Sequence, residues 1–411
     1  MNVKETKGIT LIALVITIVV LLILVGVVIA TLNGNDNIIK NANTAVGKYN
    51  EKANEEQGVL DTLEEKLKEY TNGGSSNPPT PGEPGTPPTT PTVDSNGLAT
   101  TPTTIKPSTN NANNLQIVIP AGFAPAILQT GTTQSLPGED GSVKNKMPAS
   151  QWNNITTDDI NKGIVVVDAD GNEFVWIPIT DASKFARKAW TIGSNTTAQT
   201  LAATSTEYAY WEDTSTTEYT NMVNSITSNK GFYVARYEAS ANGDKAQSKR
   251  EKNVWTGISQ TDAITKSANY NSTLHSHLMY GIEWDSILNW LNGNATISSS
   301  TSGETKTMEL ADLQTNSCSW GNYRKSTGNA STNSGSKQTT GKSEYWKANN
   351  IYDLAGNVYE WTQEKYSTGA DRANRGGFCN YSGDNLPAAI RNGLDASNAN
   401  LNMGFRASFY L

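Results

Sequence analysis

The sequence has little cysteine, little histidine and no excess of positive charge, and each shortage excludes a class of protein. Two cysteines in 411 residues cannot form a disulfide framework or a cysteine-based metal site, although they do not exclude a single disulfide between Cys318 and Cys379. The formal net charge of −7 gives no electrostatic attraction to nucleic acid or to anionic lipid, so neither is an expected partner. The length allows two or three domains.

Charge and proline are both missing from Ile9 to Leu32, a run of 24 residues. This length crosses a bilayer core as a helix, so residues 9–32 are predicted to be a transmembrane helix. A short leader, residues 1–8, precedes it and carries Lys4 and Lys7. Positive residues favour the cytoplasmic side, so we expect a single-pass protein with its body outside the cell.

Two different segments follow the apolar run. Residues 38–71 have apolar side chains at helical spacing and alternating charges, which predicts a solvated stalk helix. Residues 72–110 hold nine of the 15 prolines and many threonines, so they are predicted to be an extended linker without helix or sheet.

The remainder, residues 115–411, contains all ten tryptophans and is predicted to be a globular head. Short β-branched or aromatic segments predict strands, and apolar residues at 284, 287, 288 and 291 share one face of a helix. The predicted strands are residues 163–168, 173–178 and 231–238. Together these elements indicate a mixed α+β fold with much irregular loop.

The N-terminal sequence Lys7-Gly8-Ile9-Thr10-Leu11-Ile12-Ala13-Leu14 resembles the N-terminus of type IV prepilins. The resemblance implies cleavage by a prepilin peptidase between Gly8 and Ile9, followed by association with other pilin-like subunits through the apolar helix. The protein would then reside at the cell surface or in a pilus. Ala13 stands where pilins commonly carry Glu, which favours a minor or terminal subunit. A secretory signal peptide and a plain signal anchor are the alternatives.

Several head segments resemble, in order, the formylglycine-generating-enzyme-like (sulfatase-modifying factor) domain, which has a C-type-lectin-like fold. The ordered set covers about residues 164–411, and it implies that Arg375 and Arg406 are structural. The segments that carry it are Phe174-Val175-Trp176-Ile177-Pro178, Gly231-Phe232-Tyr233-Val234-Ala235-Arg236-Tyr237-Glu238-Ala239, Trp284-Asp285, Tyr352-Asp353-Leu354-Ala355-Gly356-Asn357-Val358-Tyr359-Glu360-Trp361-Thr362, Arg375-Gly376-Gly377-Phe378 and Gly404-Phe405-Arg406.

The catalytic residues of this family are not matched. Members that oxidise cysteine in sulfatases use a Cys pair after the Arg-Gly-Gly motif, where this sequence has Cys379 alone. The iron-dependent sulfoxide synthases need three His ligands, and the chain has only His275 and His277, which are expected to be ordinary surface or satisfied polar side chains. We therefore expect no enzyme activity.

Calcium is the one cofactor that the resemblance suggests. The resemblance implies a Ca²⁺ site formed by the side chains of Asn357 and Glu360 and the carbonyl of Val358. The alternative is that Asn357 caps a turn and Glu360 pairs with an arginine.

The last segment is rich in Asn, Ser and Asp, a composition typical of binding loops on rigid scaffolds. It is similar to the variable tails of retroelement-diversified lectin-fold proteins, although an ordinary family loop would have the same composition. The head is thus predicted to bind an extracellular protein or glycan for adhesion; a structural filament subunit or an oxidoreductase are the alternatives. The candidate ligand-binding residues, with Tyr381 as the aromatic anchor, are Asn380, Tyr381, Asp384, Asn385, Asn392, Asp395, Asn398 and Asn400.

Overall fold

The chain divides into two units, Met1–Thr86 and Pro87–Leu411, in a computed structural model. The structure describes residues 90–411 apart from 108–109, 132–137, 203–204, 206–207, 209–210, 271–273, 299–304, 325, 327–334 and 367–368. The predicted cleavage site at Gly8 and Ile9, the transmembrane helix 9–32 and the stalk 38–71 lie outside these residues. Within the described part, none of the helices has the length and apolar content needed to cross a membrane.

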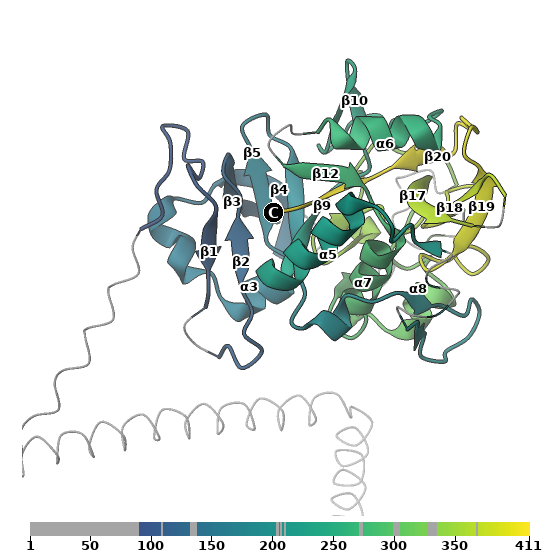
Figure 1. The fold of residues 1–411 in the computed structure, drawn as a ribbon, viewed down its shortest axis with the longest axis horizontal. Coiled ribbons are helices and arrows are strands. Elements are labelled where there is room, and N and C mark those ends of the chain that lie inside the picture. The colour runs from purple at the N-terminus through teal and green to yellow at the C-terminus, as the bar shows by residue number, and fades with distance from the viewer. Residues whose placement is uncertain are drawn as a thin grey trace, which may run out of the picture. The chain divides into compact units, whose positions relative to one another are not determined.

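A seven-stranded antiparallel sheet forms the centre of the head, in the order β12-β21-β9-β6-β5-β3-β4 (Figure 1). All pairs that the register defines are antiparallel, and Val175 of β6 pairs with Val165 of β5 and Val234 of β9. The strands are β3 (Phe123–Gly131), β4 (Gly138–Lys146), β5 (Val165–Asp168), β6 (Glu173–Pro178), β9 (Gly231–Ala235), β12 (His275–Leu278) and β21 (Ala407–Tyr410). The predicted strands 163–168, 173–178 and 231–238 are therefore confirmed as β5, β6 and β9.

One face of this sheet packs against two helices, α5 (Thr217–Asn229) and α7 (Gly281–Leu291). Val165, Val175 and Val234 point to this side and share a hydrophobic cluster with the helices. The predicted helical face is confirmed, because Trp284, Ile287, Leu288 and Leu291 of α7 are all buried in that cluster.

The opposite face is covered by the segment before β3 and by the segment between β4 and β5. Because side chains alternate along a strand, Val166, Phe174 and Trp176 point this way, into a second cluster. The covering elements are β1 (Thr103–Ile105), β2 (Ile117–Ile119), the 3₁₀ helix η1 (Ala149–Asn154) and α3 (Thr157–Asn161).

The head therefore begins before residue 115, and the linker boundary at residue 110 is wrong. Ile105 lies in the predicted linker, yet β1 pairs with β2 and Ile105 is 3% exposed. Leu98 and Ala99 are buried in the same cluster. A proline has no backbone N–H and so cannot donate a hydrogen bond to a neighbouring strand, but a short strand can form between two prolines. Residues 103–105, between Pro102 and Pro107, are such a strand.

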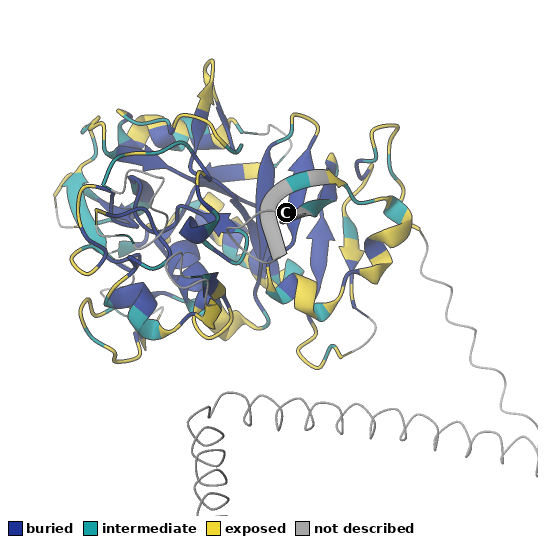
Figure 2. Cartoon of the chain, turned by 180° about the vertical axis from the view of Figure 1, so that it is seen from behind, coloured by how far each residue is buried: buried dark blue, intermediate teal, exposed yellow. Residues whose placement is uncertain are grey.

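A second sheet of four strands, ordered β19-β18-β17-β20, lies at the other end of the head (Figure 1). Its strands are β17 (Tyr359–Lys365), β18 (Asp371–Arg375), β19 (Arg391–Asp395) and β20 (Met403–Phe405). A third hydrophobic cluster joins this sheet to α6 (Gln260–Ala268). Figure 2 shows that the strands of both sheets are largely buried, while the exposed residues gather on turns and helix surfaces.

The remaining elements are short. Four two-stranded sheets decorate the loops: β7 (Lys188–Ala189) with β8 (Gln199–Thr200), β10 (Ser240–Asn242) with β11 (Lys245–Gln247), β13 (Thr296–Ser298) with β14 (Thr305–Thr307), and β15 (Lys347–Ala348) with β16 (Ile351–Tyr352). Three further helical turns are η2 (Ala182–Lys184), α8 (Leu310–Gln314) and η3 (Glu344–Trp346). The described part of the chain is thus a mixed α+β head with much irregular loop, as predicted.

Candidate functional site

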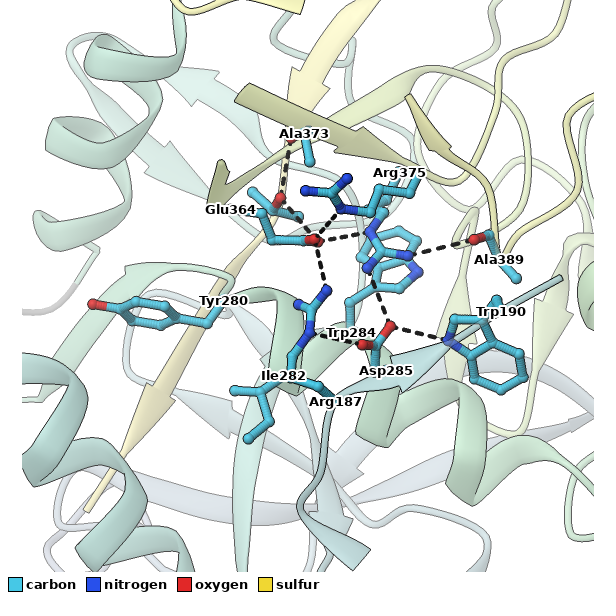
Figure 3. A network of polar contacts seen from close by, with 12 residues as sticks. Arg187, Trp190, Tyr280, Ile282, Trp284, Asp285, Glu364, Ala373, Arg375 and Ala389 are labelled. Atoms are coloured by element: carbon cyan, nitrogen blue, oxygen red, sulfur yellow. Dashed lines mark hydrogen bonds and ion pairs between the residues drawn. The ribbon is translucent and has the colours of Figure 1, made fainter. Parts of the chain in front are cut away.

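A buried cluster of charged side chains lies where α7 meets the strands β17 and β18 (Figure 3). Arg187 is at its centre and pairs with Glu212, with Asp285 of α7 at 3.0 Å and with Glu364 of β17 at 2.8 Å. All four side chains are 0% exposed. Burial raises the pKa of Glu212 to about 7, with Arg187 opposing the shift.

Two further arginines complete the cluster from the second sheet. Arg375, at the end of β18, contacts Glu364 at 2.7 Å and Asp285 at 3.1 Å, and Arg391 contacts Glu364 at 2.8 Å. Burial alone would raise the pKa of Glu364, but these arginines and Arg187 hold it well below its usual value. Three cations thus face three carboxylates, and a buried set with balanced charge is the arrangement that a protein interior tolerates.

This cluster fixes both ends of residues 376–390. Arg375 donates through Nη1 to the carbonyl of Ala389 at 3.4 Å, and the Trp284 indole donates to the carbonyl of Ala388 at 3.3 Å. Directly after this segment, the Arg391 guanidinium lies over the Trp211 ring, 4.3 Å from its centroid. Arg375 is therefore a structural residue, as the sequence predicted.

The first part of this segment, residues 378–386, is held by its backbone; we call it the Tyr381 loop. Arg324 N–H donates to the carbonyl of Tyr381 at 2.9 Å, and Ser317 N–H donates to the carbonyl of Gly383 at 3.1 Å. Gly383 N–H in turn donates to the Cys318 sulfur at 3.1 Å. A Cβ at Gly383 would lie 2.7 Å from the Cys318 backbone nitrogen, so the close approach requires glycine.

Tyr381 itself stands out from this fixed backbone, with 47% of its surface exposed. Its ring packs on Phe378, with centroids 5.1 Å apart, and Phe378 packs on Tyr359 of β17 at 4.9 Å. The predicted ligand-binding residues Asn380, Asp384 and Asn385 are exposed on the same loop. The structure thus brings four of the eight predicted residues together.

The other four lie on β19 and the turn that follows it, and two of them have local roles. Asp395 accepts from the N–H of Ser397 at 2.8 Å and from its hydroxyl at 2.6 Å, and Asn400 accepts from Asn402 N–H at 2.8 Å. Their side chains stabilise turns, as Asp and Asn commonly do. The remaining two, Asn392 and Asn398, are half-buried.

The residues predicted to bind Ca²⁺ make internal contacts. Glu360 accepts from Arg406 at 2.7 Å (Nη2) and 3.0 Å (Nε), which also makes Arg406 structural. Asn357 has φ 56° and accepts from Asn322 Nδ2 at 3.0 Å, while Val358 N–H donates to Glu238 at 3.2 Å. These contacts are those of the alternative interpretation, a turn residue and an arginine pair.

Within the described ranges, no group of three or more His, Cys, Asp and Glu side chains is arranged to hold a metal ion. Calcium binding at residues 357–360 stays a prediction, and it would require Glu360 to leave Arg406.

The two histidines are two residues apart on β12, so their side chains lie on the same face of the strand, and both rings pack on Tyr410. His277 is 2% exposed and contacts Glu283 and Ser408, each at 3.1 Å, while His275 is exposed and stacks on Tyr410. Glu283 accepts from His277, Ser408 and the Tyr280 N–H through one oxygen, at the start of α7. This grouping is a buried brace, and both histidines are the ordinary polar side chains that the sequence predicted.

Sequence reasoning missed four members of the buried cluster: Arg187, Glu212, Glu364 and Arg391. Arg187 and Glu212 lie in a stretch without periodicity or recognisable motif, so no sequence signal could have assigned them a partner. Cys318 and Cys379 are both buried and are not joined by a disulfide in this structure.

Comparisons with known proteins give a limited result. No protein-family model and no curated protein matches the chain. Among solved structures, it is similar to PvdO from Pseudomonas aeruginosa, at 12% identity over 59% of this chain and 96% of that one, with a TM-score of 0.37. It is also similar to CarF, at 12% identity over 55% and 97% with a TM-score of 0.29.

A third similarity is to variable protein 1 of Treponema denticola, at 13% identity over 76% of this chain and 100% of that one, with a TM-score of 0.24. All three TM-scores are below 0.5, so no property of these proteins is transferred to the chain.

Proposed function

We propose that this chain is a pilin-like surface protein whose non-catalytic head binds a ligand through the Tyr381 loop and so mediates adhesion. One observation carries the proposal: the loop backbone is fixed while Tyr381 and its polar neighbours are exposed. A loop that is already ordered loses little conformational entropy on binding, which is the general advantage of a preorganised site. The head would belong to the formylglycine-generating-enzyme-like domains with a C-type-lectin-like fold.

The rest of the chain would carry the head to the surface. A prepilin peptidase would cut between Gly8 and Ile9, and residues 9–32 would hold the protein in the membrane until it associates with other pilin-like subunits. The proline-rich linker, now ending near residue 90, would separate the head from its anchor. The apolar run and the leader sequence support this part of the proposal.

Binding without catalysis is favoured by what the charged residues do. Glu364 forms buried ion pairs with Arg187 and Arg375, and Glu360 forms one with Arg406. Cys379 lies alone after the Arg-Gly-Gly motif, and burial, with Glu238 adding to it, raises the pKa of its thiol to about 11. A thiol with so high a pKa is a poor nucleophile at neutral pH.

The experiment compares adhesion by intact bacteria that express the full chain or its Tyr381→Ala variant. Deleting residues 380–402 would remove β19, so a point substitution is the better test of the loop. We expect Tyr381→Ala to reduce adhesion at least about tenfold, because large exposed aromatics commonly anchor interfaces. Equal surface amounts are checked by protease accessibility, and Tyr366→Ala, at another exposed tyrosine, is the matched control. Unchanged adhesion by the Tyr381 variant would refute the binding role.

The processing step has its own readout. Gly8→Arg should leave the leader attached, so the mass of the protein in membranes would exceed that of the wild type by the eight leader residues. Gly26→Ala, inside the apolar run, should be processed normally. A wild-type protein that begins at Met1 would contradict the pilin-like interpretation.

A further inference from the structure

We infer that the Tyr381 loop is a calcium-independent carbohydrate site, in which a pyranose ring stacks on Tyr381 and its hydroxyls bond to the amides and the carboxylate beside it. This inference rests on the proposed function and names the ligand class that its binding loop takes.

Among the residues that the structure describes, the Tyr381 ring packs against one aromatic ring, that of Phe378. Phe378 is 8% exposed and lies between Tyr381 and the half-buried Tyr359, so three tilted rings connect the second sheet to the surface. The backbone of Tyr381 is fixed as well, by its N–H to Phe378 O at 3.2 Å and by Arg324 N–H on its carbonyl at 2.9 Å. The exposed side of the ring is therefore a fixed aromatic surface. The C–H face of a pyranose, with its partial positive charge, packs well on such a π face.

Polar groups flank the ring closely in sequence. Asn380, Asp384 and Asn385 are exposed on the same nine-residue loop. Planar amide and carboxylate groups present paired donors and acceptors, which match the neighbouring hydroxyls of a sugar. Asp384 accepts from the Ser382 hydroxyl, so its orientation is set before any ligand arrives.

The apolar surface is too small for the core of a protein interface. Stable protein interfaces bury about 800 Å² on each partner and have an apolar centre. Over the described residues, the exposed large hydrophobic side chains are Ile192, Tyr366, Tyr381 and Leu401. They do not form one patch on this loop: Tyr366 lies against Gly393 of β19, and Leu401 lies against Gly257. One tyrosine ring suits one sugar ring.

The test titrates the full chain, in a zwitterionic detergent without a sugar headgroup, with cellotriose, lactose, chitotriose and mannotriose. Saturation-transfer NMR identifies the sugar that binds and the ring face that contacts the protein, and calorimetry gives its affinity. We expect binding that EDTA leaves unchanged, a loss of at least about tenfold in Tyr381→Ala, and near wild-type affinity in Tyr381→Phe and Tyr381→Trp, because both keep the π face. Asn380→Ala and Asn385→Ala should each weaken binding, and Tyr366→Ala should not.

Three outcomes would overturn the inference: none of the four sugars binds, Tyr381→Ala binds as tightly as the wild type, or EDTA abolishes binding. If no sugar binds while bacterial adhesion still depends on Tyr381, the ligand is a protein and the proposed function stands. If adhesion does not depend on Tyr381, the proposed function fails independently of the sugar experiment. A protein that retains its circular dichroism and thermal transition excludes unfolding as the cause in each variant.

Discussion

His277 is a buried imidazole whose surroundings favour its charged form. It contacts the Glu283 carboxylate and the Ser408 hydroxyl, both at 3.1 Å, and the carbonyl of His275 at 2.9 Å. The rings of Tyr280 and Tyr410 pack beside it. Burial alone would lower the pKa of His277, but the charge and hydrogen bond of Glu283 outweigh burial, so the pKa is raised above 6.5.

The pH dependence of stability follows from this shift. A group whose pKa is raised on folding adds stability that is complete below its unfolded pKa and is lost as pH rises through the folded value. Stability measured by urea unfolding should therefore fall as pH rises above 6.5, and His277→Gln should flatten that part of the curve. Glu212 and Asp353, each with a pKa raised to about 7 by burial, act in the same direction in both proteins, so the difference isolates His277. Parallel curves for the two proteins would contradict the assignment.

Among the elements, α7 depends on a glycine at its first residue. Gly281 allows Arg187 and Glu364 to lie directly against the start of the helix, because an added Cβ would overlap the guanidinium and the carboxylate. Glu283 also accepts from Tyr280 N–H at 2.8 Å and so caps the same end.

Gly281→Ala should therefore destabilise the head by about 1–3 kcal/mol through overpacking, although alanine is the better helix former by about 1 kcal/mol. Urea unfolding monitored by tryptophan fluorescence gives the change. Asn221→Ala, at an exposed site on α5, should change stability by less than about 0.5 kcal/mol. A stabilised Gly281→Ala protein would show that the buried cluster moves aside without cost.

Elements were more predictable from sequence than contacts. The strands at 163–168, 173–178 and 231–238 and the helical face of Trp284 follow from local periodicity, which the chain itself displays. The partners of Glu360 and Arg187 do not, because an ion pair between residues 25 to 177 positions apart leaves no local pattern. The candidate site was predictable to the same extent. Composition indicated the Asn-rich segment, but only the structure shows that the side chains of Asp395 and Asn400 bond within their own turns.

At the scale of the whole molecule, the Arg187 cluster connects parts of the head that are distant in sequence. Arg187 contacts Asp285 of α7, Glu364 of β17, and Glu212 in the segment between β8 and α5. Figure 3 shows Arg187, Asp285, Glu364 and Arg375 converging on one point between the elements. Loss of the central cation would leave three carboxylates facing only Arg375 and Arg391.

Arg187→Met should accordingly reduce the free energy of unfolding by about 3–5 kcal/mol, the cost typical of breaking a buried pair by removing one partner. Lys162→Ala is the control, because Lys162 and Asp158 form an exposed pair, with side chains 66% and 71% exposed. Such pairs contribute no more than about 1 kcal/mol. Equal effects of the two substitutions would show that the cluster adds nothing to stability.

The position of β21 has a consequence for how the head is made. This strand, residues 407–410, lies between the edge strand β12 and β9, so it joins β12 to the rest of the seven-stranded sheet although it follows every other strand in the chain. While a ribosome is still adding residues before 407, β12 has no neighbour and β9 has only one. The seven-stranded sheet can therefore close only after residues 407–410 have been synthesised, so the head completes its fold as one unit after translation of its last strand.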